Sequence, residues 1–191
     1  MATPGPARAL TLQSAVIVRT ALPPGLERLR RRSVADAAEG VPAHLTLLYP
    51  FVDPERLTAA TRRALRDVAR RHAPFEYTLG RMATWPDTVY VAVEPAAPFV
   101  RLQRDLQVAF PAHPIYGRDT ATFTFVPHVT VAEGAVVRDS ALHTDRGWLV
   151  LPRRRNATAI EVIASRPDGR WHMVWRMRLG DSAKAVDRMR P

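Results

Sequence analysis

The sequence predicts a mixed α/β domain of the α+β class, because segments with strand patterns alternate along the chain with segments of helical spacing. The chain has 191 residues, a length that suits one well-buried domain. Apolar residues make up 47% and charged residues 24%, which are ordinary values for a folded protein. We expect a loose segment over residues 1–12, a single two-lobed domain over 13–180 and a tail over 181–191.

In the first half, a β-branched run predicts a buried strand at 14–21, which a Pro-Pro-Gly sequence ends. Apolar residues at helical spacing predict a helix over 26–38, and we expect its arginines at 28–32 to be solvated. A strand over 44–51 follows. An acid, a proline and a second acid at 53–55 then predict the start of a helix that runs to about residue 71.

The second half repeats the order of strands and a helix. Alternating residues predict strands at 75–79 and 88–93 around a Trp-Pro-Asp turn, and helical spacing predicts a helix over 98–110. A further strand is predicted at 122–131. The last three strands are predicted at 147–151, 159–164 and 171–179.

The pattern histidine-apolar-threonine-apolar occurs twice in this chain, each time in a strand-like run. Side chains alternate between the faces of a strand, so His44 and Thr46 share one face while Tyr49 points to the other. The same alternation places His128 and Thr130 together. One copy alone is more plausibly incidental, since threonine is a good strand former. Two copies favour a shared site.

Paired imidazoles and hydroxyls suit chemistry at a phosphate. Histidine has an ordinary pKa of about 6.5, so it can take and give a proton near neutral pH. One imidazole could activate an attacking water while the other protonates the departing oxygen. Threonine hydroxyls could donate to the phosphate oxygens and stabilise the charge of the transition state. The sequence therefore predicts a phosphate site served by His44 and His128 with Thr46 and Thr130.

The composition narrows the cofactors and partners. There are 28 lysines and arginines against 18 acids, a net charge of +10, and Lys184 is the only lysine. This charge favours anionic ligands such as nucleotides or RNA, although GC-rich codon usage would also raise the arginine content. With no cysteine and no metal-ligand spacing among the histidines, we expect neither a metal nor a cofactor. No apolar run is long enough for a signal or a membrane span, so we expect a cytoplasmic protein.

The two motifs resemble the paired signatures of the 2H phosphoesterase superfamily, which includes the 2′-5′ RNA ligase-like proteins. The histidines lie 84 positions apart, and the flanking sequences at 42–51 and at Tyr116-Gly117 are also similar. The resemblance implies two mainly antiparallel sheets related by a pseudo-twofold, with helices outside and a central cleft. It also implies metal-independent hydrolysis of 2′,3′-cyclic phosphates, with His44 as the acid on the leaving oxygen and His128 as the base.

The sequence leaves alternatives open for the ligand and for the function. Phe51 and Tyr116 are the preferred candidates for stacking on a base, because they lie near the motifs in sequence. The expected partner is an RNA end or a small nucleotide that carries a cyclic phosphate, bound by a monomer. The alternative function is a non-catalytic RNA- or nucleotide-binding module that uses the same basic cleft. A third is a 2′-5′ ligase whose ligated product accumulates.

Overall fold

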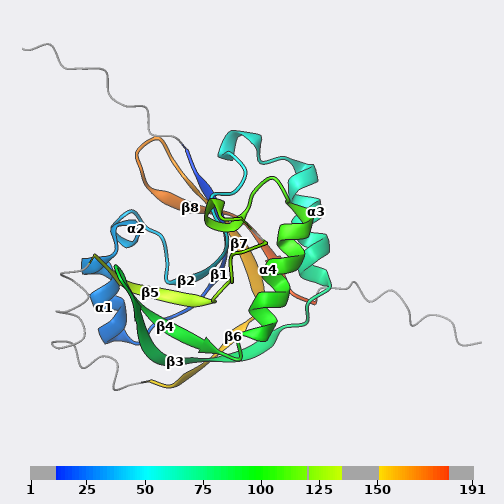
Figure 1. The fold of residues 1–191 in the computed structure, drawn as a ribbon. Coiled ribbons are helices and arrows are strands. Elements are labelled where there is room, and N and C mark those ends of the chain that lie inside the picture. The colour runs from blue at the N-terminus through cyan, green and yellow to red at the C-terminus, as the bar shows by residue number, and fades with distance from the viewer. Residues whose placement is uncertain (1–11, 120, 135–150, 181–191) are drawn as a thin grey trace, which may run out of the picture.

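Two four-stranded antiparallel sheets form the centre of the fold, with strand orders β2-β1-β7-β8 and β5-β4-β3-β6 (Figure 1). The computed structural model describes residues 12–119, 121–134 and 151–180. The two antiparallel sheets and the helices beside them confirm the predicted mixed α+β class. The strands are β1 (Ser14–Arg19), β2 (His44–Leu48), β3 (Phe75–Trp85), β4 (Thr88–Glu94), β5 (His128–Glu133), β6 (Arg153–Ala157), β7 (Ala159–Ser165) and β8 (Trp171–Arg178).

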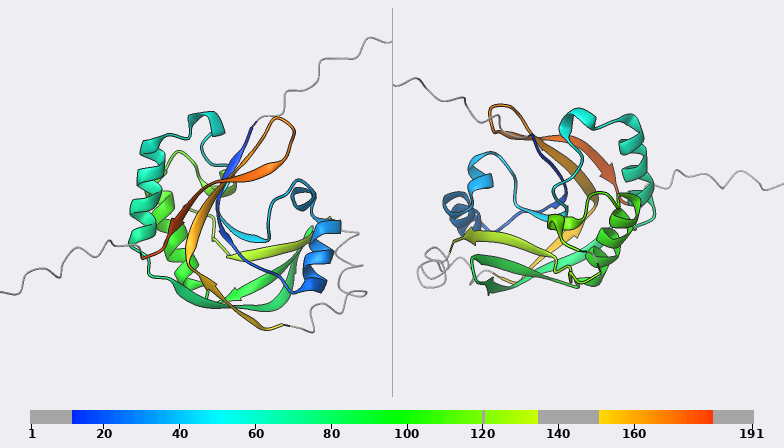
Figure 2. Two further views of the ribbon diagram at one scale, coloured as in Figure 1. Left: turned by 180° about the vertical axis from the view of Figure 1, so that it is seen from behind. Right: turned by 45° about the horizontal axis from the view of Figure 1, so that its top comes forward.

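The helices lie outside the sheets, as predicted. The pair α3 and α4 packs side by side on one flank, whereas α1 contacts β5 on the other (Figures 1 and 2). The helices are α1 (Pro24–Ser33), α2 (Ala35–Ala38), α3 (Ala59–Arg70) and α4 (Ala97–Ala109).

The two motif strands occupy corresponding places in the two sheets. Each is an edge strand, β2 beside β1 and β5 beside β4, and the two contact each other. Most of the buried apolar side chains of both sheets and of the helices belong to one core cluster. This shared core sets the two motif strands at a fixed separation.

Phe99 of α4 is central to that core. Its side chain is fully buried, and its ring meets the edges of Phe75 at 4.8 Å and Tyr77 at 5.0 Å between centroids. We expect Phe99→Ala to lower the free energy of unfolding by about 3–5 kcal/mol, because it removes these contacts and leaves a cavity. Val108→Ala on the same helix is the control, since Val108 is 76% exposed. Urea unfolding measures both, and equal midpoints would contradict the assignment of Phe99 to the core.

Both predicted helices of the first half differ from the structure. The helix expected over 26–38 is interrupted by Val34, which is extended (φ −129°, ψ 117°) and buried, so α1 and α2 are separate. The helix expected from residue 53 begins at Ala59 instead. Asp53 caps only a short 3-10 turn, Pro54–Arg56, whereas Thr58 and Thr61 form the capping box of α3.

The strand predicted over 122–131 is shorter at its start. β5 begins at His128, directly after Pro127, because a proline has no N–H to donate to the neighbouring strand. Residues 147–150 of another predicted strand lie outside the described residues. The basic run at 153–155 belongs to the edge strand β6, which pairs with β3.

Candidate active site

A cleft of about 880 Å³ opens between the two sheets and receives side chains from both. His44 and Thr46 of β2 line it, and so do His128 and Thr130 of β5. The structure thus brings all four residues of the two motifs into one cleft. Their neighbours on the opposite strand face, Leu45 among them, are fully buried in the core.

Each motif strand carries a β-bulge directly after its threonine. On β2, Val16 of the partner strand β1 pairs with Leu48 and the next residue pairs with Thr46, so Leu47 is extra. On β5 the pairing skips Val131 in the same way. The extra residue reverses the alternation beyond it. The two bulges therefore mark the end of the regular histidine–threonine face in each sheet.

The bulge on β2 corrects the prediction for Tyr49. The alternation predicted that Tyr49 points away from His44, but Tyr49 lines the cleft, and its hydroxyl donates to Gln13 Oε1 at 2.7 Å. Because one residue is inserted before it, Tyr49 returns to the face that carries His44.

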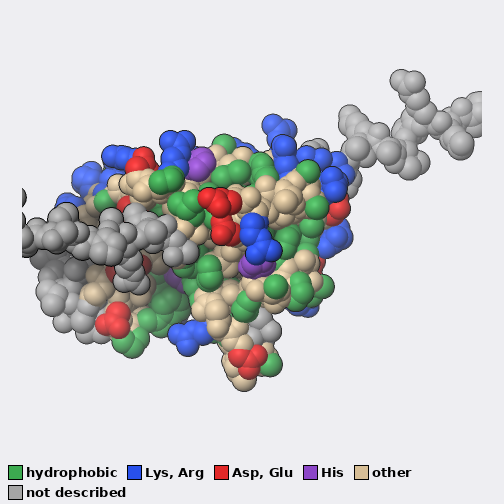
Figure 3. Space-filling view, turned by 90° about the horizontal axis from the view of Figure 1, so that it is seen from above, with side chains coloured by type: hydrophobic (Ala, Val, Ile, Leu, Met, Phe, Trp, Pro, Cys, Tyr) green, Lys and Arg blue, Asp and Glu red, His purple; other side chains and the backbone are tan. Residues whose placement is uncertain are grey.

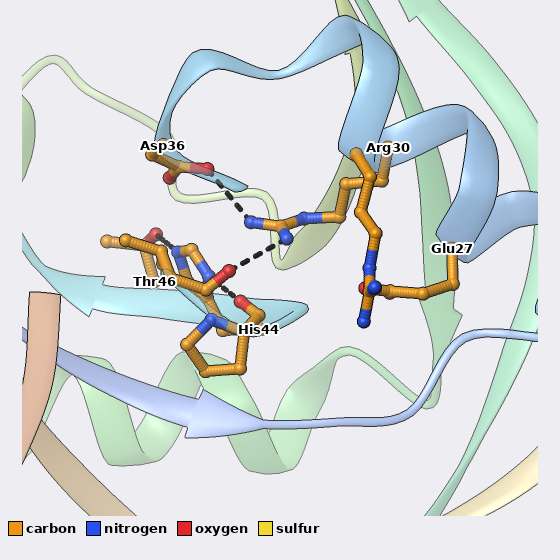
Figure 4. Close-up of polar contacts among 8 residues, drawn as sticks. Glu27, Arg30, Asp36, His44 and Thr46 are labelled. Atoms are coloured by element: carbon orange, nitrogen blue, oxygen red, sulfur yellow. Dashed lines mark hydrogen bonds and ion pairs between the residues drawn. The ribbon is translucent and has the colours of Figure 1, made fainter. Parts of the chain in front are cut away.

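The two imidazoles are held in the same way. His44 Nδ1 lies 2.8 Å from the Pro42 carbonyl, and His128 Nδ1 lies 2.8 Å from the Val126 carbonyl. A carbonyl oxygen only accepts, so Nδ1 carries the proton in both rings. In the neutral form Nε2 is then the unprotonated nitrogen of each. At His44 this nitrogen lies 3.1 Å from Thr46 Oγ1, which donates to it (Figure 4).

Burial sets the charge of both histidines. The pKa of His44 is lowered to about 4, chiefly by burial and also by the neighbouring Arg30 and His128, while the hydrogen bond to the Pro42 carbonyl opposes the shift. Burial also lowers the pKa of His128, against the hydrogen bond to Val126. Both imidazoles are therefore neutral near pH 7 in the free protein.

An NMR titration of the free protein should show His44 with a midpoint near pH 4. In the unfolded chain the same ring titrates at about 6.5. Between these values the unfolded chain binds a proton that the folded chain does not bind. The free energy of unfolding should therefore fall as the pH is lowered from about 6.5 to 4, with no contribution from His44 above that window. A His44 midpoint at or above 6.5 would show that the surrounding side chains do not desolvate the ring.

Aromatic side chains surround the histidine pair. Trp85 stacks on Tyr90 with centroids 4.1 Å apart, and its ring meets the His128 imidazole edge-on at 4.6 Å. Tyr116 lines the cleft at 37% exposure, is hydrogen-bonded to Thr46, and has a left-handed backbone (φ 54°). Trp85, also in the cleft lining, is 36% exposed. Both rings are placed to meet a ligand.

Phe51, the other predicted stacking residue, lies elsewhere. It is 5% exposed, and its ring packs edge-on against Phe110 at 5.0 Å in the core. A ring with both faces covered by the core is closed to a base. Proximity in sequence to the motif misled the prediction, since β2 ends at Leu48 and the chain beyond it turns Phe51 into the core.

The charges along the cleft balance, in contrast to the predicted basic cleft. Among the described residues, the lining contains three arginines and three acids: Arg30, Arg118, Arg166, Asp36, Glu39 and Glu133. The arginines at 153–155 are not in this lining. On the face seen in Figure 3, basic side chains are scattered with acidic ones among them. Most of the net positive charge therefore lies outside the cleft.

Arg30 was missed by the sequence interpretation, which placed the whole basic cluster at 28–32 in solvent. Its side chain is 2% exposed. Leu26 lies four positions earlier on α1 and is fully buried, so the helical spacing already placed Arg30 on the inward face.

Metal-ligand clusters and membrane-spanning helices are both absent from the described residues. No three histidine, aspartate or glutamate side chains are grouped as metal ligands there. No helix in the same ranges is long and apolar enough to span a membrane.

Solved structures share this fold. TT0787 of Thermus thermophilus aligns with a TM-score of 0.57 and 20% identity over 89% of this chain and 99% of that one. Escherichia coli LigT complexed with 3′-AMP aligns with a TM-score of 0.51 and 19% identity over 87% of this chain and 97% of LigT. At these identities the likeness concerns the fold.

Sequence relatives carry phosphoesterase names. A candidate phosphoesterase of Oceanobacillus iheyensis, OB1230, is 31% identical over 96 residues, which are 49% of this chain and 53% of the relative. A candidate phosphoesterase of Bacillus pumilus gives the same values. The chain thus spans about half the length of the curated relatives it matches.

A family model for the 2′-5′ RNA ligase superfamily matches residues 18–162, a range that contains both motif strands and the whole of the β5-β4-β3-β6 sheet. The paired motifs, the shared cleft and this match agree. The chain belongs to the 2′-5′ RNA ligase superfamily.

Proposed function

We propose that this protein is a metal-independent phosphodiesterase that hydrolyses 2′,3′-cyclic phosphates of nucleotides or RNA ends. The observation that carries the proposal is the convergence of two equivalently held imidazoles, each with a threonine two residues on, in one cleft. The cleft volume of about 880 Å³ is in the range of small-molecule sites. The structures of Escherichia coli LigT complexed with 3′-AMP, NADP+ and ATP support a nucleotide ligand.

The proposed reaction needs two proton transfers. His128 Nε2 takes a proton from water as the water oxygen bonds to phosphorus, and His44 Nε2 gives a proton to the 3′ oxygen as its bond to phosphorus breaks. The products are a 2′-phosphate and a free 3′ hydroxyl. Thr46 and Thr130 donate to the non-bridging oxygens and hold the phosphorus between the rings.

The low pKa of His44 constrains the acid role. With a pKa of about 4, its Nε2 carries no proton in the free protein at pH 7. An anionic phosphate beside the ring favours the imidazolium and raises its pKa, so the proton is acquired together with the substrate. The rings of Tyr116 and Trp85, both partly exposed in the cleft, are the proposed stacking surfaces for a base.

The test is incubation of the purified protein with 2′,3′-cyclic nucleotides in the presence of EDTA, with products separated by chromatography. Formation of the 2′-phosphate supports the proposal. A requirement for a divalent metal would contradict the two-histidine mechanism. Binding with steep salt dependence and no turnover would instead favour the nucleotide-binding module.

A further inference from the structure

Arg30 is a buried cation at the wall of the cleft whose contacts lead to the catalytic histidine. Its guanidinium Nη1 donates to the Val41 carbonyl at 2.9 Å, and Nη2 donates to Asp36 Oδ1 at 2.9 Å (Figure 4). One side chain of α1 thus fixes both α2 and the segment that enters β2.

The segment that Arg30 holds also holds His44. Val41 precedes Pro42, and the Pro42 carbonyl accepts from His44 Nδ1. A shift of the Val41 carbonyl would move the next peptide unit and with it the acceptor for the imidazole. The orientation of the ring, with Nδ1 toward the backbone and Nε2 toward Thr46, therefore depends on an anchored entry to β2.

The charge of Arg30 reaches His44 as well. The charged or titratable groups that act on this ring are Arg30 from α1 and His128 from β5, and both oppose its protonation. Burial lowers the pKa of Arg30, and the carboxylates of Asp36, Glu27 and, from the end of β5, Glu133 oppose that shift. A guanidinium is protonated throughout the ordinary pH range in proteins. Arg30 therefore stays charged beside a ring that must gain and lose a proton.

We propose that Arg30 is a positioning residue for His44, which fixes the entry to β2 so that the imidazole keeps one tautomer and one orientation. Its effect on turnover rests on the proposed function. Its effect on the ring does not, because the tautomer is a property of the free protein.

The experiment compares Arg30→Met and Arg30→Lys with Arg31→Met. Methionine keeps most of the length but removes the charge and the donors, whereas lysine keeps the charge without the planar pair of donors. Arg31 is the matched control, since it is the next residue of the same helix and is 72% exposed. The readouts are nitrogen NMR of the His44 tautomer, its titration midpoint, and kcat and KM for a 2′,3′-cyclic nucleotide. Circular dichroism checks the fold.

In Arg30→Met we expect a mixed His44 tautomer, a midpoint above the wild-type value, and kcat reduced by about 10- to 100-fold with KM within about threefold. Arg30→Lys should keep the midpoint near that of the wild type but show a mixed tautomer and a reduced kcat. Arg31→Met should match the wild type in all readouts.

A folded Arg30→Met with unchanged tautomer and midpoint would overturn the proposal, and so would a rise in KM alone, which would make Arg30 a substrate ligand. If Arg30→Met does not fold, the test is the His44 tautomer in Arg30→Lys: a mixed tautomer supports the proposal and an unchanged one overturns it. If the wild type hydrolyses no cyclic nucleotide, the proposed function fails while the NMR readouts still test the positioning role.

Discussion

Replacement of either cleft histidine with asparagine should reduce kcat on a 2′,3′-cyclic nucleotide by about 10²–10⁴-fold, the usual contribution of a proton transfer. His44 and His128 both donate from Nδ1 to a backbone carbonyl. An asparagine amide can keep that hydrogen bond while it removes the ring nitrogen that faces the cleft. The loss should therefore fall on kcat with little change in stability, measured by steady-state kinetics and urea unfolding.

His113→Asn is the matched control, because His113 lies outside the cleft lining and packs near Phe51. Its kcat should match that of the wild type. The double replacement of His44 and His128 should cost little more than the worse single replacement, because residues that act in one step are not additive. Full activity in either single variant would show that the ring is not needed for turnover.

Loss of a threonine hydroxyl should have the next largest effect. Valine has the shape of threonine without the hydroxyl, and removal of one donor to a developing oxyanion costs about 10²-fold or more in kcat. We expect Thr46→Val to lose more than Thr130→Val, because the Thr46 hydroxyl also contacts His44 Nε2 and is hydrogen-bonded to Tyr116. Single-turnover kinetics at saturating substrate measure the difference.

Serine is the control at both positions, since it restores the hydroxyl. Thr46→Ser and Thr130→Ser should retain most of the wild-type kcat. If valine and serine variants were equally active, the phosphate would not depend on these hydroxyls, and backbone amides or arginines would have to hold it.

Short-range patterns carried most of the successful predictions. Strand alternation placed His44 with Thr46 and His128 with Thr130, and the structure sets all four in one cleft. Helical spacing located α4 and its buried face at Phe99. These features depend on the spacing of apolar and polar residues within a single strand or helix, and that spacing can be seen in the sequence.

The errors occur where a second element decides the outcome. Tyr49 lies beyond a bulge that is defined only by the pairing of β2 with β1, and Phe51 is buried by its contact with Phe110, which follows α4. Arg30 has a polar side chain on an apolar helix face, and it is stabilised there by Asp36 and the Val41 carbonyl. A sequence pattern does not contain the partner that makes such a position favourable.

The paired bulges have a consequence for the cleft itself. β2 and β5 are edge strands of different sheets that contact each other, and open edges carry backbone groups ready to pair. Pairing would join the sheets into one continuous ladder and close the cleft between them. An unmatched residue at Leu47 and another at Val131 interrupt the regular spacing of each edge. The irregularity that ends each motif therefore also works against pairing of the two edges, between which the cleft lies.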